Sequence, residues 1–248
     1  MSKGEKLFLK KRLGQHFLCN SAILEREVRE ANVQGKVVLE IGGGDGRLTE
    51  FIVKAGAKKI YVVEKDQRFV EILKNKFTNS KNVFVLAGDF LTIEIPKDVE
   101  VIIGNIPYYI SSGIIFKLKN KNIEHAILMV QKEFAEKMVA RPKTKNYGRL
   151  SVTSQIFFDV KLLFKVSAHQ FTPPPKVSSA VISLKPKGIY LNEEEENIIR
   201  KIYQQKNKKL RNVLPGIDLI WAEKRGRELT PAEILRIVKA YSLNSSAS

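Results

Sequence analysis

The sequence predicts an α/β protein with a doubly wound, mostly parallel sheet, followed by a small all-α C-terminal domain. Three observations carry this prediction. Short apolar runs of strand type alternate with segments of helical periodicity over the first half of the chain, which is the pattern of βαβ units. A glycine-rich turn directly follows the first of these runs. Beyond residue 188 the signals are helical only.

The elements are expected in a regular order along the chain. A helix over 22–31, capped by Ser21, comes first, because apolar residues recur there on one face. The alternating part then predicts strands at 36–41, 59–63, 83–87, 99–104 and 126–130. Helices are expected between and after them, near 46–55, 66–77, 111–119 and 131–139. Strands joined by helical crossovers run parallel, which gives the doubly wound sheet.

From about residue 149 the pattern changes. Three further strands, at 150–157, 161–166 and 179–184, have the spacing of hairpins and predict an antiparallel edge. Residues 186–188 read Pro-Lys-Gly, a linker composition, so the predicted domains are 1–187 and 188–248. In the second domain, Thr230 and Glu233 flank Pro231 in a capping box, which predicts a helix start.

Composition excludes several classes of protein. The 248 residues are 44% apolar, enough for a sizeable core, and no apolar run is long enough to span a membrane. The N-terminus has no apolar signal-peptide core, so we expect a cytoplasmic protein. Cys19 is the single cysteine, which excludes an intramolecular disulfide, and with three scattered histidines we expect no metal site.

The charge points to a polyanionic partner. The chain carries a net charge of +17 and has a pI near 9.8. Residues 188–248 contain 11 Lys and Arg against 8 Asp and Glu, so +14 of that charge lies in residues 1–187. A balance of this size favours nucleic acid over a membrane surface, and an enzyme of small molecules would not need it.

Polar or glycine features follow four consecutive predicted strands. They are the turn Glu40-Ile-Gly-Gly-Gly-Asp-Gly46, then Glu64, then Gly88-Asp-Phe90, then Asn105-Ile-Pro-Tyr108. In a parallel open sheet the carboxyl ends of the strands form the ligand crevice, so all four features are expected to line one cleft. Glycines in the first turn allow tight turning and close approach of the backbone to a ligand.

The first three features are typical of an S-adenosylmethionine site. The turn lacks the G-x-G-x-x-G spacing of dinucleotide enzymes and the Gly-Lys-Ser/Thr of a P-loop. Glu64 lies 22 residues after Gly42, where a carboxylate can bind the ribose hydroxyls of a nucleoside cofactor. Asp89 can accept a hydrogen bond from the adenine amino group, and Phe90 can pack on the ring. The alternative for the glycines alone is a turn that merely joins strand to helix.

The fourth feature suits a flat base with an exocyclic amino group. The side-chain oxygen of Asn105 and the carbonyl of Ile106 can both accept hydrogen bonds from one NH2 group. Pro107 stiffens the turn, and Tyr108 offers a ring for stacking. Such hydrogen bonds draw the amino nitrogen toward a tetrahedral, more nucleophilic geometry. Taken alone, the tetrad is also compatible with ordinary turn chemistry.

Taken together, these motifs resemble the KsgA-type ribosomal RNA adenine N6-dimethyltransferases nearly from end to end. The similarity includes the segments 13–18, 40–49, 105–108, 141–152, 171–178 and 205–212, the last resembling the first helix of the family's small C-terminal domain. Two departures are mild. His16 stands where the family usually has Asn, so either its ring nitrogen or its backbone can make the cofactor contact at this position. Gly43 stands where the family usually has Pro, and this change loosens the loop.

The resemblance implies residue roles. The catalytic set is Asn105, Ile106, Pro107, Tyr108 and Phe171. The residues implied for S-adenosylmethionine are Gln15, His16, Leu18, Glu40, Gly42, Gly44, Glu64, Asp89, Phe90 and Asn105. Tyr108 and Phe171 would sandwich the target adenine once it leaves its stack. Without the resemblance, Phe171 before three prolines is read more simply as an anchor of a rigid loop.

Basic clusters are candidates for contacts to RNA phosphates. They comprise Lys10, Lys11, Arg12, Arg141, Lys143, Lys145, Lys206, Lys208, Lys209 and Arg211. Charge runs are more often solvated surfaces, but the large net charge favours RNA contact.

The resemblance therefore implies dimethylation of two neighbouring adenines in the 3′-terminal hairpin of 16S rRNA, on a small-subunit assembly intermediate. A monomer is the default expectation for the oligomeric state. Two alternatives stay open. One is an antibiotic-resistance enzyme that methylates an adenine of 23S rRNA, which residues 193–248 argue against. The other is an RNA-binding assembly or transcription factor, which the intact Glu64, Asp89 and Asn105–Tyr108 set argues against.

Overall fold

The computed structural model describes residues 16–245. The predicted contacts of Lys10, Lys11, Arg12 and Gln15 lie outside the described residues.

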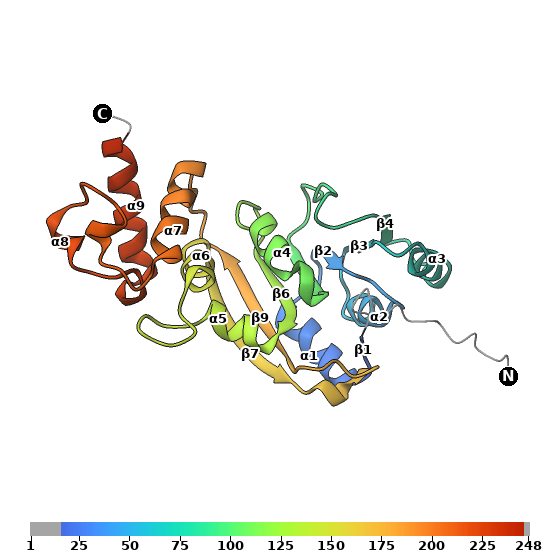
Figure 1. Cartoon of the computed structure of the whole chain (residues 1–248). Coiled ribbons are helices and arrows are strands. Elements are labelled where there is room, and N and C mark those ends of the chain that lie inside the picture. Colours follow the sequence, from blue (N-terminus) through green and yellow to red (C-terminus); the bar gives the residue numbers. More distant parts are fainter. Residues whose placement is uncertain (1–15, 246–248) are drawn as a thin grey trace.

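A seven-stranded sheet with helices around it forms the body of the molecule (Figure 1). Its strands are β2 Val37–Ile41, β3 Lys59–Glu64, β4 Val83–Ala87, β5 Val101–Asn105, β6 His125–Gln131, β7 Phe158–Val166 and β9 Ser179–Pro186. Two short strands, β1 Phe17–Leu18 and β8 Phe171–Thr172, form a separate pair. The α-helices are α1 Ser21–Ala31, α2 Arg47–Lys54, α3 Gln67–Lys76, α4 Ser111–Leu118, α5 Lys132–Met138, α6 Arg149–Phe157, α7 Glu193–Gln204, α8 Leu219–Ala222 and α9 Pro231–Ser245.

The sheet confirms the predicted fold class. Its order is β4-β3-β2-β5-β6-β9-β7. The first five strands are mutually parallel, whereas β9 pairs antiparallel with both β6 and β7. The chain runs outward from β2 to β4 and then returns to β5 on the other side of β2. The topological switch point, where ligands bind in open α/β sheets, therefore lies between β2 and β5.

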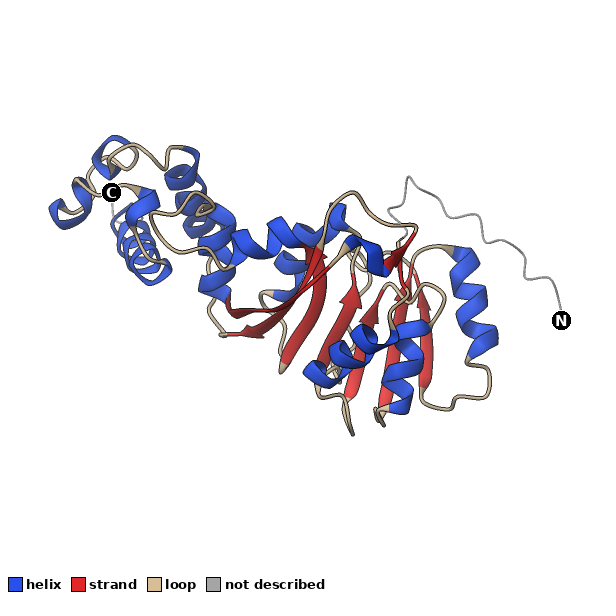
Figure 2. Cartoon of the chain, turned by 90° about the horizontal axis from the view of Figure 1, so that it is seen from below, coloured by secondary structure: helices blue, strands red, loops and turns tan. Residues whose placement is uncertain are grey.

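Two apolar layers hold the sheet between helices, and Figure 2 shows helices on both of its faces. One layer joins the sheet to α1, α2 and α3 through residues such as Leu24 and Ile52. The other joins it to α4, α5 and α6 through residues such as Ile114 and Val152, and it continues into α7 and α9. Neighbouring strand residues alternate between the layers, because side chains of a strand point to opposite faces. Val38 faces the first layer, and Leu39 faces the second.

The predicted strand at 150–157 is wrong, because this segment is α6. Its β-branched and aromatic residues suggested a strand, but local hydrogen bonds and packing against α5 and α9 favour a helix. Ser151 Oγ accepts from the backbone N–H of Gly148 at 3.1 Å and donates to the carbonyl of Lys137 at 2.6 Å. Thr153 Oγ1 donates to the Arg149 carbonyl one turn earlier at 2.9 Å.

Two smaller expectations also need correction. Asn20, rather than Ser21, caps the first helix, since its Oδ1 accepts from the backbone N–H of Ala22 at 3.0 Å. The segment 205–212 is not a helix: α7 ends at Gln204, and a turn leads to a single 3-10 turn at Leu210–Asn212.

The C-terminal helices lie beyond the β7 edge of the sheet, at the end of the molecule opposite the N-terminal strands (Figure 1). The fully buried Tyr147 ties them to the body, because its hydroxyl donates to the carbonyl of Leu229 at 2.5 Å. The predicted capping box starts α9: Thr230 N donates to Glu233 Oε2 at 2.7 Å, and Glu233 N donates to Thr230 Oγ1 at 3.2 Å. The boundary at residue 188 stays a prediction.

Candidate active site

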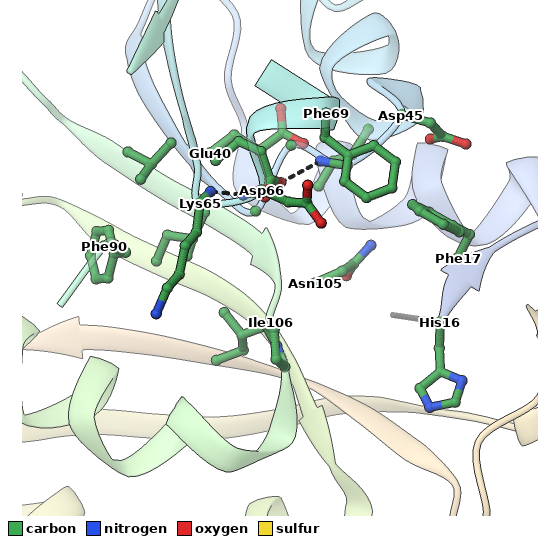
Figure 3. A pocket seen from close by; sticks show the side chains of 18 of the residues that line it. His16, Phe17, Glu40, Asp45, Lys65, Asp66, Phe69, Phe90, Asn105 and Ile106 are labelled. Atoms are coloured by element: carbon green, nitrogen blue, oxygen red, sulfur yellow. Dashed lines mark hydrogen bonds between the residues drawn. The ribbon is translucent and has the colours of Figure 1, made fainter. Parts of the chain in front are cut away.

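A cavity of about 770 Å³ opens at the carboxyl ends of β2, β3, β4 and β5. Figure 3 shows its side chains converging from these strand ends and from the segment around His16. Every predicted cofactor or catalytic residue within the described chain lines it, namely His16, Leu18, Glu40, Gly42, Gly44, Glu64, Asp89, Phe90, Asn105, Ile106, Pro107, Tyr108 and Phe171. The expectation of one common cleft is met, while the individual roles stay predictions.

The glycine turn after β2 takes a backbone conformation that favours glycine. Gly42, Gly44 and Gly46 have φ angles of 79°, 52° and 80°. A Cβ at Gly44 would also lie 2.9 Å from the ring of Phe17. L side chains rarely adopt such φ values, so substitution of these glycines strains the turn. The turn keeps its backbone close to the cavity.

Gly43 was expected only to loosen the loop, but the structure shows that it also permits close packing. A Cβ there would lie 2.3 Å from Cγ1 of Val62 and 2.8 Å from Cδ1 of Leu73. The glycine at this position therefore lets the turn pack directly onto β3 and α3.

The Glu64 carboxylate, at the end of β3, is fixed by the backbone. Its Oε2 accepts from the N–H of Gly44 at 2.9 Å. Its Oε1 accepts from the N–H groups of Lys65 and Asp66, both at 2.8 Å. These three bonds link the glycine turn to β3 and hold a negative charge in the cavity wall.

Asp89, which follows β4, is also held as an acceptor. Lys65 Nζ lies 2.7 Å from its Oδ2, and the Leu91 N–H donates to its Oδ1 at 2.9 Å. The hydrogen bond from Lys65, with that from Leu91, lowers the pKa of Asp89 below its ordinary value. The next residue, Phe90, is buried, and the ammonium of Lys117 lies 4.9 Å from its ring centroid.

The Asn105–Tyr108 tetrad begins on the last residue of β5. Asn105 Oδ1 is buried and has no hydrogen-bond partner. Ile106 is anchored in the core, and Pro107 has a φ of −59° before a 3-10 turn over Tyr108–Ile110. The Tyr108 hydroxyl lies 2.8 Å from Ser179 Oγ on β9, and burial raises the pKa of Tyr108. An unpartnered buried oxygen costs free energy unless a ligand satisfies it.

Phe171 comes from a distant segment that pairs with the N-terminal motif. Strands β1 and β8 are antiparallel, with Phe17 opposite Thr172 and Leu18 opposite Phe171. His16 Nδ1 lies 2.7 Å from the Pro173 carbonyl oxygen, to which it donates. That nitrogen is therefore already engaged within the protein. Phe171 is 6% exposed and packs in the core, so it is both an anchor of its loop and part of the cavity wall.

Two carboxyl groups near the cavity are deeply buried. Glu40 is fully buried, and its Oε2 accepts from Thr49 Oγ1 at 2.6 Å while its Oε1 has no partner. Glu27, on α1, is 1% exposed. Burial raises the pKa of each from 4.5 to about 8. Glu27 was not predicted from the sequence to lie near the site. Its position between Leu24 and Val28, on the apolar face of the predicted helix, could have indicated a buried carboxyl group.

Sequence reasoning also missed two aromatic residues of the cavity wall. Phe17 and Phe69 pack edge to face with ring centroids 5.5 Å apart, and both line the cavity (Figure 3). Phe17 lay inside the N-terminal motif, but Phe69 faces the cavity from the first turn of α3, which only the fold brings there.

Those predicted RNA-binding residues that the structure describes fall into two groups near one another. The exposed Arg141, Lys143 and Lys145 lie between α5 and α6, and the Lys143 N–H donates to the Arg227 carbonyl at 2.8 Å. The second group follows α7: Lys206 Nζ donates to the Tyr147 carbonyl at 2.9 Å, and Lys209 and Arg211 both pair with Glu223, whereas Lys208 is exposed. The basic loop after α5 therefore lies against the C-terminal region.

Within residues 16–245, no group of three or more His, Cys, Asp or Glu side chains is placed to hold a metal ion. No helix of that same stretch has the length and apolar character to cross a membrane.

A family model described as ribosomal RNA adenine dimethylase matches residues 7–230 of the chain. A protein of Methanopyrus kandleri named probable ribosomal RNA small subunit methyltransferase A is 42% identical over 226 residues, covering 87% of this chain and 80% of the relative. The protein of the same name in Methanococcoides burtonii is 39% identical over 245 residues, covering 90% of each.

Solved structures show the same architecture. A dimethyladenosine transferase from Plasmodium falciparum superposes with a TM-score of 0.85 at 29% identity, over 93% of this chain and 98% of that one. The 23S rRNA methyltransferase ErmE superposes with a TM-score of 0.70 at 27% identity, over 91% of this chain and 99% of that one.

Proposed function

The chain belongs to the ribosomal RNA adenine dimethylase family, and from that premise we propose that it transfers methyl groups from S-adenosylmethionine to N6 of two adjacent adenines in the 3′-terminal hairpin of 16S rRNA. The observation that carries the proposal is the buried Asn105 Oδ1 without a partner. Asn105 lines a cavity that Glu64, Asp89, Tyr108 and Phe171 also line. An acceptor of this kind fits an exocyclic amino group, which brings donors.

The residues present fit the cofactor. The Glu64 carboxylate, held by three backbone N–H groups, would bind the ribose hydroxyls. Asp89 would accept from the adenine amino group beside Phe90, and the turn at Gly42 and Gly44 would admit the amino acid end close to the backbone. S-adenosylmethionine supplies a methyl group activated by the positive charge of its sulfonium.

The protein's contribution to the reaction is to orient the adenine. Asn105 Oδ1 and the Ile106 carbonyl accept hydrogen bonds from N6, which weakens the delocalisation of its lone pair into the ring. Tyr108, steadied by its contact with Ser179, offers one face for stacking, and Phe171 offers the other. Alignment in a fixed geometry then lowers the barrier to displacement. The proton leaves N6 after the transfer, so no general base is assigned.

Basic residues would hold the RNA. Phosphate contacts position a nucleic acid without reading its sequence, and the exposed Arg141, Lys143, Lys145 and Lys208 suit that role. Lys209 and Arg211 already pair with Glu223, so phosphates would compete with that carboxylate. We further propose that the chain acts as a monomer, in the cytoplasm, on a small-subunit assembly intermediate.

A second candidate is methylation of a 23S rRNA adenine, which the fold shared with ErmE favours. The higher TM-score to the dimethyladenosine transferase and the small-subunit names of the relatives from Methanopyrus kandleri and Methanococcoides burtonii support the first candidate.

The experiment that separates them uses radiolabelled S-adenosylmethionine with 30S subunits that lack the modification, 50S subunits and free adenosine in parallel. Labelled N6,N6-dimethyladenosine from 30S subunits alone is the expected result. Label in 50S subunits would favour the second candidate. RNA binding without any label would favour a binding factor and contradict both.

A further inference from the structure

Glu27 is a buried carboxyl group that the proposed mechanism does not use. It lies on the inward face of α1, which packs against α2, β5 and β6. The side chain is 1% exposed, and its Oε2 has no hydrogen-bond partner. Burying a carboxyl group without a cation beside it costs free energy, so the polar groups around Glu27 decide its protonation state.

Asn105 is a polar neighbour of Glu27. A hydrogen-bond interaction between the two side chains opposes the effect of burial on the pKa of Glu27. Asn105 Oδ1 is likewise buried without a partner. The amide of Asn105 thus lies between the Glu27 carboxyl and the open cavity, into which Figure 3 shows it reaching.

An amide has two different ends, and only one of them suits the target. The oxygen accepts hydrogen bonds, whereas the NH2 group donates them. An ionised carboxyl group can only accept, so it accepts a hydrogen bond from the Asn105 NH2 group. The amide oxygen, Oδ1, then faces the cavity. A protonated carboxyl can donate to Oδ1, which turns the NH2 group toward the cavity and sets donor against donor at the adenine N6.

We propose that Glu27 is a positioning residue that orients the Asn105 amide, and that its ionised form presents Oδ1 to the target amino group. The inference rests on the proposed function and deepens it. It assigns Glu27 no contact with the substrate; its effect on methyl transfer passes through Asn105 alone.

A pH dependence follows, because burial raises the pKa of Glu27 to about 8. Glu40, on β2, is the charged group that interacts with Glu27 from the sheet. Two basic groups on the elements that pack against α1 are engaged with other partners. Arg47, on α2, pairs with Asp45 at 2.8 Å, and His125 Nε2, on β6, lies 3.0 Å from the carbonyl oxygen of Ala31 at the end of α1. Below the pKa, the transfer rate should rise about tenfold per pH unit as the ionised fraction grows.

The test is the single-turnover rate of methyl transfer to 30S subunits between pH 6 and pH 9, at saturating S-adenosylmethionine. The wild-type rate should rise about 100-fold across this range for a group with a pKa of about 8. Glu27→Gln and Glu27→Leu should both lose this rise, since neither side chain ionises. Glu25→Gln is the matched control, because Glu25 is an exposed residue of the same helix, and it should keep the rise.

The binding of S-adenosylmethionine, measured by calorimetry, shows whether each variant retains a folded site. A folded Glu27→Gln variant that keeps the wild-type rise would overturn the proposal.

A second measurement needs neither catalysis nor a variant of Glu27. In the wild-type protein with 15N-labelled asparagine side chains, the amide resonances of Asn105, assigned by their loss in Asn105→Ala, should titrate with the kinetic pKa. Resonances that stay constant from pH 6 to pH 9 would refute the inference. A wild-type protein that makes no methylated adenine at any pH would instead refute the proposed function, and the titration would still decide the role of Glu27.

Discussion

The buried Glu40 makes the unfolding free energy depend on pH, and Glu40→Gln should remove the part of this dependence that comes from Glu40. Burial raises the pKa of Glu40 from 4.5 to about 8, with the Thr49 hydrogen bond opposing and the charges of Glu64, Glu27 and Asp45 adding to the rise. A folded-state pKa above the unfolded value means that the native state binds the proton more tightly. The stabilisation is therefore complete below pH 4.5 and is lost as the pH rises through 8.

The size of the pKa shift of Glu40 sets the size of the expected change in unfolding free energy. Each pKa unit corresponds to about 1.4 kcal/mol, so the rise from 4.5 to about 8 amounts to at most roughly 5 kcal/mol. Gln keeps the size of the side chain and an acceptor for Thr49 but does not ionise. Relative to wild type, the variant should therefore gain several kcal/mol between pH 5 and pH 9.

The assay is urea unfolding of both proteins at pH 5 and pH 9. Any pH-independent cost of the new NH2 group cancels when the two differences in unfolding free energy are compared. A difference between variant and wild type that is the same at both pH values would refute the reasoning, because Glu40 would then have an ordinary pKa in the folded protein.

Three further predictions concern the frame of the site. Tyr147→Phe removes the hydroxyl that donates to Leu229 and should lower the unfolding free energy by about 1–2 kcal/mol in urea unfolding; no change would show that this bond is not stabilising. Gly104→Ala should cost about 1–3 kcal/mol, read as a lower melting temperature, because its Cβ would lie 2.6 Å from the Ile41 carbonyl between β2 and β5; an unchanged melting temperature would contradict the close approach. Glu64→Gln replaces an acceptor of three backbone N–H groups by an amide and should weaken S-adenosylmethionine binding about tenfold or more in calorimetry, whereas equal affinity would remove Glu64 from the cofactor site.

Much of the site could be predicted because it lies at strand ends. Once the chain is recognised as strands joined by helices, the residues after β2, β3, β4 and β5 must share one edge of the sheet. Glu64, Asp89 and Asn105 all follow from that rule, and all line the cavity. Their sequence spacing carries the information without any knowledge of side-chain packing.

What could not be predicted depends on contacts between distant segments. Phe69 reaches the cavity only because α3 packs beside the glycine turn, and Glu27 meets Asn105 only because α1 packs on β5. The β-branched residues of 150–157 misled the strand prediction, since their helix is stabilised by α5 and α9 and by Ser151. In each case tertiary packing overrides local preference.

The central claim is that Asn105 activates the target amino group, and the rate of a single methyl transfer tests it most directly. The measurement compares wild type with Asn105→Ala on 30S subunits that lack the modification, at saturating S-adenosylmethionine. Loss of one preorganised hydrogen-bonding group in a buried site should slow the transfer about 100-fold or more. A variant rate within threefold of wild type, at comparable cofactor occupancy, would contradict the account.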